Sequence, residues 1–173
     1  MIWFTSDLHL GHDAIIRMCN RPFGSIDEMN DTLVRNFNEY VKKNDTIYFL
    51  GDISYKLKVE EANEMISKLN GKKYLCVGNH DKKYDGKLFE DIADCMRVNF
   101  NGIHLTLMHY PMLEWYKSRQ GAIHLHGHQH NKAEYNLQQR ELGIRRYDVG
   151  VDANNYHPVS MKEIIKFYSV STK

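Results

Sequence analysis

Apolar residues in the first half of the chain follow two different spacings. Continuous apolar runs at residues 1–5 (MIWFT), 46–50 (TIYFL) and 73–77 (KYLCV) are typical of short buried strands. Between these runs, residues 25–43 and 58–70 place apolar side chains at intervals of three and four, which predicts amphipathic helices. The first half is therefore predicted to alternate strands with helices.

The second half is richer in strands. CMRVNF and IHLTLMH lie on either side of Asn101-Gly102, a dipeptide favoured in tight hairpin turns. AIHLHG and IRRYDVGV indicate two more strands, and PVSMKEIIKFY predicts a final helix that is capped by Ser160. This order of elements predicts an α/β protein, a single domain over residues 1–173, with layered, mixed sheets and the helices outside.

Composition restricts the environment and the partners. The chain has 173 residues and a formal net charge of +1, so charge gives no reason to expect long nucleic acids or anionic membranes as partners. Its three cysteines form no C-x-x-C pair, which favours a reducing compartment. We see neither a basic leader nor an apolar run of the roughly 20 residues that cross a bilayer. We therefore expect a cytoplasmic protein, either a monomer or a homodimer.

Polar signatures follow five of the predicted strands. The first three signatures are Asp7-Leu8-His9, Gly51-Asp52 and Gly78-Asn79-His80-Asp81, and later strands lead into His109 and into His128-Gln129-His130. In open α/β sheets, ligand sites form outside the carboxyl ends of the strands. We therefore expect these signatures to converge on one crevice although they are far apart in sequence.

Oxygen and nitrogen donors dominate this set. Without His80 and Asp81, it holds two Asp carboxylates, one Asn amide and four imidazoles, which is more than one metal ion needs. An oxygen and nitrogen ligand set of this kind suits manganese, iron or zinc. It differs from the soft, thiolate-rich ligand set of many structural zinc sites. Single motifs leave alternatives open: Asp7-x-His9 could be a polar turn, His109 a core histidine, and His128 with His130 a lone structural zinc site.

Taken in order, the motifs D-x-H, G-D, G-N-H-D, H and G-H-x-H resemble those of the calcineurin-like metallophosphoesterases. NRPFGSIDEMN, HYPMLEW and VGVDANNYHPVSMKEI resemble a small bacterial and phage branch of that family. The resemblance implies an α/β/β/α sandwich and two divalent ions, with manganese expected and iron, zinc or nickel as alternatives. One ion would be bound by Asp7, His9, Asp52 and His130, and the other by Asp52, Asn79, His109 and His128.

The resemblance also implies a reaction. A hydroxide that bridges the two ions would attack a small phosphomonoester or phosphodiester, with nucleotides among the candidate substrates. His80 would be the general acid, and Asp81 would orient its ring. We interpret His12 and Arg21 as contacts to the substrate. A scaffold that binds partners on the same fold without chemistry is the alternative, and the complete ligand set opposes it.

Several other residues have simpler interpretations. His104, His124 and His126 alternate within predicted strands, which favours structural roles. Trp115 and its aromatic neighbours after His109 either line the pocket or pack under a loop, and the second arrangement is the commoner one.

Overall fold

The computed structural model describes residues 1–169. Its first sheet has five strands in the order β4-β3-β2-β1-β9. The first four are parallel to one another and β9 is antiparallel to β1. The strands are β1 (Ile2–Thr5), β2 (Thr46–Phe49), β3 (Lys72–Cys76), β4 (Asp91–Ala93) and β9 (Val159–Ser160).

The second sheet has four strands in the order β5-β6-β7-β8. An antiparallel hairpin with Asn101-Gly102 at its turn joins β5 to β6, and the other pairs are parallel, so both sheets are mixed. The strands are β5 (Cys95–Phe100), β6 (Ile103–Met108), β7 (Ile123–His126) and β8 (Arg146–Asp148).

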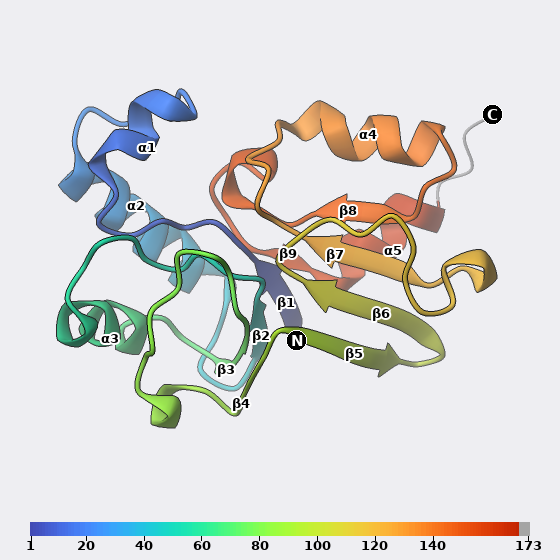
Figure 1. The fold of residues 1–173 in the computed structure, drawn as a ribbon, viewed down its shortest axis with the longest axis horizontal. Helices are drawn as coiled ribbons and strands as arrows, with labels where there is room; N and C mark the ends of the chain where they lie inside the picture. Colours follow the sequence, from blue (N-terminus) through green and yellow to red (C-terminus); the bar gives the residue numbers. More distant parts are fainter. Residues whose placement is uncertain (170–173) are drawn as a thin grey trace.

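Helices flank both sheets (Figure 1). The α-helices are α1 (Asp13–Met18), α2 (Ile26–Tyr40), α3 (Val59–Ser67), α4 (Ala133–Glu141) and α5 (Met161–Ser169). Short 3-10 turns are η1 (Gly86–Leu88), η2 (Ser118–Gln120) and η3 (Val151–Ala153). Ser25 caps α2 by accepting a hydrogen bond from the Glu28 N–H, and Ser160 caps α5 in the same way through Glu163.

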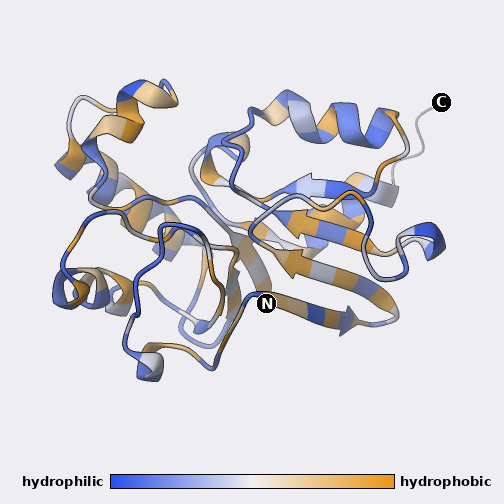
Figure 2. Ribbon diagram, viewed as in Figure 1, coloured by the Kyte–Doolittle hydropathy of each residue, from blue (hydrophilic) through white to orange (hydrophobic). Residues whose placement is uncertain are grey.

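Two apolar clusters separate the layers. Trp3 on β1 packs in one cluster with Leu33 of α2 and Ile66 of α3, on the outer face of the first sheet. Its neighbour Phe4 points to the opposite face and packs with Leu125 of the second sheet. Apolar positions accordingly concentrate in the central strands (Figure 2). The predicted layered α/β arrangement is confirmed.

Among the strands and the longer helices, β4, β9 and α4 lie outside the sequence prediction. β4 and β9 are three and two residues long, too short for a recognisable spacing. The buried residues of α4 are Asn136 and Gln139, so the helix has no apolar face to detect. Asn136 instead forms two hydrogen bonds with the main chain of Asp148 at the end of β8. Within residues 1–169, no helix combines the length and the apolar character that a membrane span requires.

Candidate metal centre

The polar signatures converge where the strands of both sheets end. Main-chain hydrogen bonds from Asp7 N to Gly51 O (3.1 Å) and from His9 N to Asp52 O (3.0 Å) join the loops after β1 and β2. A left-handed backbone costs an L-residue about 1–2 kcal/mol, and such residues cluster at functional sites. Positive φ angles occur at five of the seven predicted ligands: Asp7, His9, Asp52, His128 and His130.

Asp52 lies at the middle of the cluster. Its Oδ2 atom is 3.5 Å from His9 Nε2 and 3.5 Å from His109 Nε2. On the side of His109, the Nε2 atom also lies 3.0 Å from Asn79 Oδ1 and 3.2 Å from His128 Nδ1. Two groups of donor atoms therefore meet at one carboxylate.

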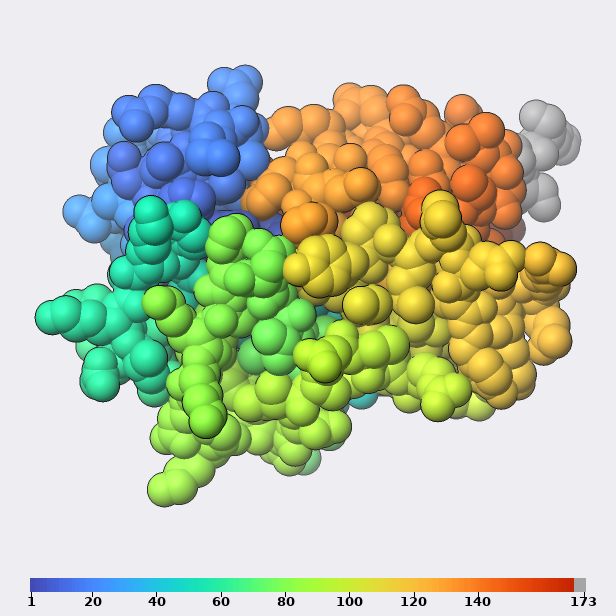
Figure 3. Space-filling view, in the orientation of Figure 1, coloured from blue at the N-terminus to red at the C-terminus, as the bar shows by residue number. Residues whose placement is uncertain are grey.

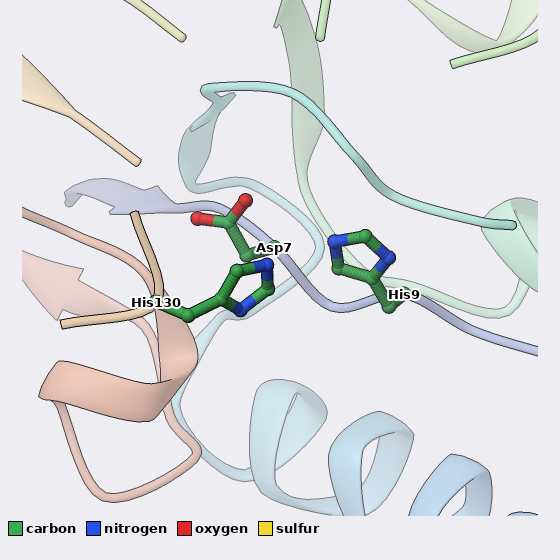
Figure 4. Close-up of side chains that lie close together, drawn as sticks. All are labelled: Asp7, His9 and His130. Carbon is green, nitrogen blue, oxygen red and sulfur yellow. The ribbon is translucent and has the colours of Figure 1, made fainter. Parts of the chain in front are cut away.

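The group on the other side contains Asp7, His9 and His130, drawn in Figure 4. One donor atom from each of these residues lies within 4.8 Å of the other two, and Asp7, Asp52 and His109 satisfy the same limit. The backbone N–H of His128 donates to both carboxylate oxygens of Asp7, at 3.2 Å and 3.0 Å. The structure thus brings together all seven residues that the sequence analysis selected as ligands.

In His109 and His130, the ring nitrogen that points away from the cluster has a hydrogen-bond partner, which determines the nitrogen that faces the cluster. His109 Nδ1 lies 2.8 Å from the carbonyl oxygen of Leu50, to which it donates, so Nε2 is the nitrogen that faces the cluster. His130 Nδ1 is 2.8 Å from Asp152 Oδ2, which leaves its Nε2 available. Metal-bound histidines are usually oriented in this way.

Unpaired and perturbed groups indicate that this donor set fits cations. His9 Nε2 is buried and has no hydrogen-bond partner among the described residues. Burial raises the pKa of Asp7 to about 8, with Asp148 and Asp52 acting in the same direction and His130 opposing them. Burial also holds the pKa of His9 well below its usual range. A cation would stabilise the ionised Asp7 and accept the lone pair of the neutral His9.

Arg21 corrects one prediction. Its side chain is fully buried and forms a two-pronged ion pair with Asp152, at 3.0 Å and 2.8 Å. It also donates to the carbonyl oxygens of Leu8 (2.9 Å) and Asp7 (2.7 Å). Through these contacts the buried Arg21 supports the first ligand loop, and it does not line the cleft above the cluster, so the predicted substrate contact has no support in the structure.

Asp81 corrects another prediction. Its carboxylate accepts hydrogen bonds from the backbone N–H groups of Gly78, Asp52 and Ile53, at 2.8 to 2.9 Å, and from the Tyr84 hydroxyl at 2.8 Å. None of these partners is the His80 ring. Asp81 therefore fixes the loop that carries Asp52 and does not orient His80.

The ring of His80 is placed by other aromatic groups. Tyr55 meets it edge-on with the ring centroids 4.8 Å apart, and the His9 ring is 5.5 Å away. The His80 backbone N–H donates to Asp52 Oδ1 at 2.8 Å. The His12 ring stacks on the Tyr55 ring with the ring centroids 3.8 Å apart. The Nδ1 atom of His12 lies 3.3 Å from the Nδ1 atom of His9.

A cleft of about 570 Å³ opens over the cluster. His80, His12 and five of the ligand residues line it, whereas Asp7 and His109 are buried below. Gly51 and Gly127 allow this packing: a Cβ atom at Gly51 would overlap His109 Nδ1, and one at Gly127 would overlap Asp7 Oδ2. The glycines of these two signatures are therefore structural requirements of the site.

The remaining histidines of β7 have structural roles. His124 is buried between Thr106 O (3.0 Å) and Met112 N (3.1 Å), and His126 is 2.9 Å from Gly127 O. Trp115 is also buried and donates to Ala122 O, so it packs under its loop.

Sequence reasoning missed two residues that support the site, Asp152 and Tyr55. Asp152 belongs to VGVDANNYHPVSMKEI, a stretch that carried the family resemblance, but it follows no strand-end pattern that would have identified it. Tyr55 lies three residues after Asp52, and its aromatic contacts depend on the folded loop.

Comparison with known proteins supports the family resemblance. The sequence pattern of the family described as calcineurin-like phosphoesterase matches residues 1–132. The uncharacterized protein MJ1445 of Methanocaldococcus jannaschii is 38% identical over 171 residues, covering 95% of this chain and 89% of that protein. The gene 66 protein of Mycobacterium phage L5 is 29% identical and covers 87% and 86%. The crystal structure of AQ665, a protein of unknown function from Aquifex aeolicus, superposes with a TM-score of 0.77 at 28% identity, covering 96% and 98%.

Proposed function

Because this chain belongs to the calcineurin-like phosphoesterase family, a family of metal-dependent hydrolases, we propose that it hydrolyses phosphoesters at a centre of two divalent metal ions. The observation that carries the proposal is the position of Asp52, whose Oδ2 atom is 3.5 Å from an imidazole nitrogen on either side. Asp7, His9 and His130 would complete the first site. Asn79, His109 and His128 would complete the second, with Asp52 shared.

The protein's own residues would prepare the site for phosphate. When bound, the two cations would neutralise phosphate oxygens and lower the pKa of a water molecule that acts as nucleophile. Leu50 and Asp152 hold His109 and His130 in the required orientation. His80 lies at the cleft surface, and we assign it the transfer of a proton to the leaving oxygen.

Two chromogenic substrates test the proposed function. We expect p-nitrophenyl phosphate, bis(p-nitrophenyl) phosphate or both to be hydrolysed when Mn²⁺ is added, and EDTA to abolish the activity. The preferred ester would identify a monoesterase or a diesterase. If two metal ions are bound and neither ester is hydrolysed, the scaffold alternative is favoured instead. A single tightly bound zinc without activity would indicate a structural metal site.

The His80→Ala variant should keep both metal ions and lose roughly 10²–10⁴-fold in kcat, because general acid catalysis typically contributes that much. The loss should be larger for an alkyl phosphoester than for a p-nitrophenyl ester, since p-nitrophenolate leaves readily without a proton. Metal content and kcat on both esters are the measurements.

His157→Ala is the matched control for this variant. His157 stacks on Tyr40 with centroids 4.7 Å apart and does not line the cleft. We expect the His157→Ala variant to have the wild-type kcat on the alkyl ester and on the p-nitrophenyl ester. A wild-type rate of His80→Ala on the alkyl ester would remove His80 from the reaction.

A further inference from the structure

The cleft is larger than a phosphate group requires. Its volume of about 570 Å³ is in the range of pockets that enclose whole small molecules. The predicted ligands are only some of its lining residues, so a phosphate held by them leaves other lining residues free. This geometry indicates that the walls contact another part of the substrate.

One wall is apolar and comes from α1. Ile15 and Met18, three residues apart on that helix, both line the cleft. Ile15 is buried, whereas Met18 is 73% exposed. An unbranched, polarisable side chain such as that of methionine adapts to the shape of an apolar or aromatic ligand. The α1 wall therefore offers contact area and no charge.

Side-chain amides stand beside the α1 wall. Asn20 lies two residues after the end of α1, and Gln129 lies in sequence between the predicted ligands His128 and His130; both line the cleft. The Gln129 Oε1 atom accepts a hydrogen bond from Asn131 at 3.3 Å, which leaves the Gln129 Nε2 group free to donate to a ligand. These amides can pair with the polar edge of a flat heterocycle.

A hydrogen bond joins α1 to the loop after β7 at one end of the cleft. Lys132 Nζ donates to the carbonyl oxygen of Cys19 at 2.7 Å, joining the end of α1 to the loop after β7. These two segments lie side by side in Figure 3, where α1 is blue and the loop is orange. This contact links the α1 wall to the loop that carries the predicted ligands His128 and His130.

We infer that the α1 wall, formed by Ile15 and Met18, binds the organic group of the substrate together with the amide of Asn20, and that this group is a planar, largely apolar ring system with polar edges, as in a nucleoside. The inference rests on the proposed function and narrows its substrate class. A simple alkyl group would form no hydrogen bonds with the amides of Asn20 and Gln129, and a sugar would gain little from the exposed thioether of Met18.

The test compares two esters that differ only in the organic group. If the protein is a diesterase, the pair is thymidine 5′-(p-nitrophenyl phosphate) and ethyl p-nitrophenyl phosphate. If it is a monoesterase, the pair is thymidine 5′-monophosphate and ethyl phosphate. We expect the wild-type kcat/KM to be at least about tenfold higher for the nucleoside ester, since small changes in apolar contact change kcat/KM by about 10–200-fold.

Variants of Met18 connect this preference to the α1 wall. Met18→Ala should reduce the ratio of the two kcat/KM values by about three- to tenfold, mainly through KM for the nucleoside ester, and Met18→Leu should restore most of it. Leu113→Ala is the control, since Leu113 is 94% exposed and lies outside the cleft. It should leave the ratio unchanged.

The outcomes separate this inference from the proposed function. Hydrolysis of both esters with equal efficiency, or a ratio that Met18→Ala does not alter, would overturn the α1 wall as a binding site and leave the proposed function intact. If none of these four esters is hydrolysed in the presence of Mn²⁺ although a p-nitrophenyl test ester is, the inference is overturned and the proposed function stands. If the p-nitrophenyl test esters are not hydrolysed either, both are overturned.

Discussion

Replacing Asp52 with asparagine is expected to weaken both metal sites at once and to lower kcat by at least about 10²–10³-fold. That range is the typical cost of removing one electrostatic contact to a transition state, and Asp52 would support two cations. The side chain keeps its shape in this variant but loses the charge between His9 Nε2 and His109 Nε2. Metal content per chain, measured after removal of loosely bound ions, should fall below the two ions expected for the wild type.

Asp45→Asn is a matched control for that experiment. Asp45 is also a largely buried aspartate, but its carboxylate pairs with the N-terminal amino group and with Trp3 Nε1 at the opposite end of β2. This variant should keep its metal ions and its kcat whatever it does to stability. If Asp52→Asn retained two ions per chain, the assignment of Asp52 as a shared ligand would be wrong.

The positions of the candidate ligands could be predicted because a general rule connects them to the sequence. Parallel strands share one carboxyl edge, so residues directly after β1, β2 and β3 must lie near one another. Each signature is also contiguous, which makes Asp7 with His9, or His128 with His130, visible without any tertiary information. The shared strand edge and the contiguous motifs are therefore enough to predict where these side chains gather.

The residues that support the cluster could not be predicted in the same way. Arg21 and Asp152 are 131 residues apart, and nothing in either local sequence indicates that they form a pair. The prediction for Arg21 used its chemistry alone, because a guanidinium near a phosphate site is typically a phosphate ligand. Its actual partners are a carboxylate and two carbonyl groups, which only the packing of η3 against the first loop determines.

Asp81 illustrates a related limit. Its proximity to His80 in sequence suggested contact between the side chains, but adjacent residues in a turn often point in different directions. The Asp81 carboxylate instead faces inward, where it accepts three backbone N–H groups and the Tyr84 hydroxyl. Satisfying buried N–H donors of the neighbouring loop is the stronger physical requirement at that position.

Removing the Asp152 carboxylate should have the largest effect on stability. Asp152→Ala would leave the Arg21 guanidinium buried without a counter-charge, a change that typically costs about 3–5 kcal/mol. For a chain of this size that corresponds to a Tm lower by roughly 6–20 °C. The same variant removes the acceptor of His130 Nδ1, so its affinity for metal should fall by about 10–100-fold. Urea unfolding and calorimetric metal titration measure the two effects.

Two further variants separate the role of Asp152 in folding from its role at the metal centre. Glu64→Ala breaks the exposed pair with Lys68 and should change neither stability nor metal affinity, because solvent screens such pairs. Asp152→Asn keeps the volume and one carbonyl oxygen, but it places an amide group opposite donors from both Arg21 and His130. It should therefore fold with a smaller loss of stability and still bind metal more weakly. Wild-type metal affinity in Asp152→Asn would show that Asp152 stabilises the fold without orienting His130.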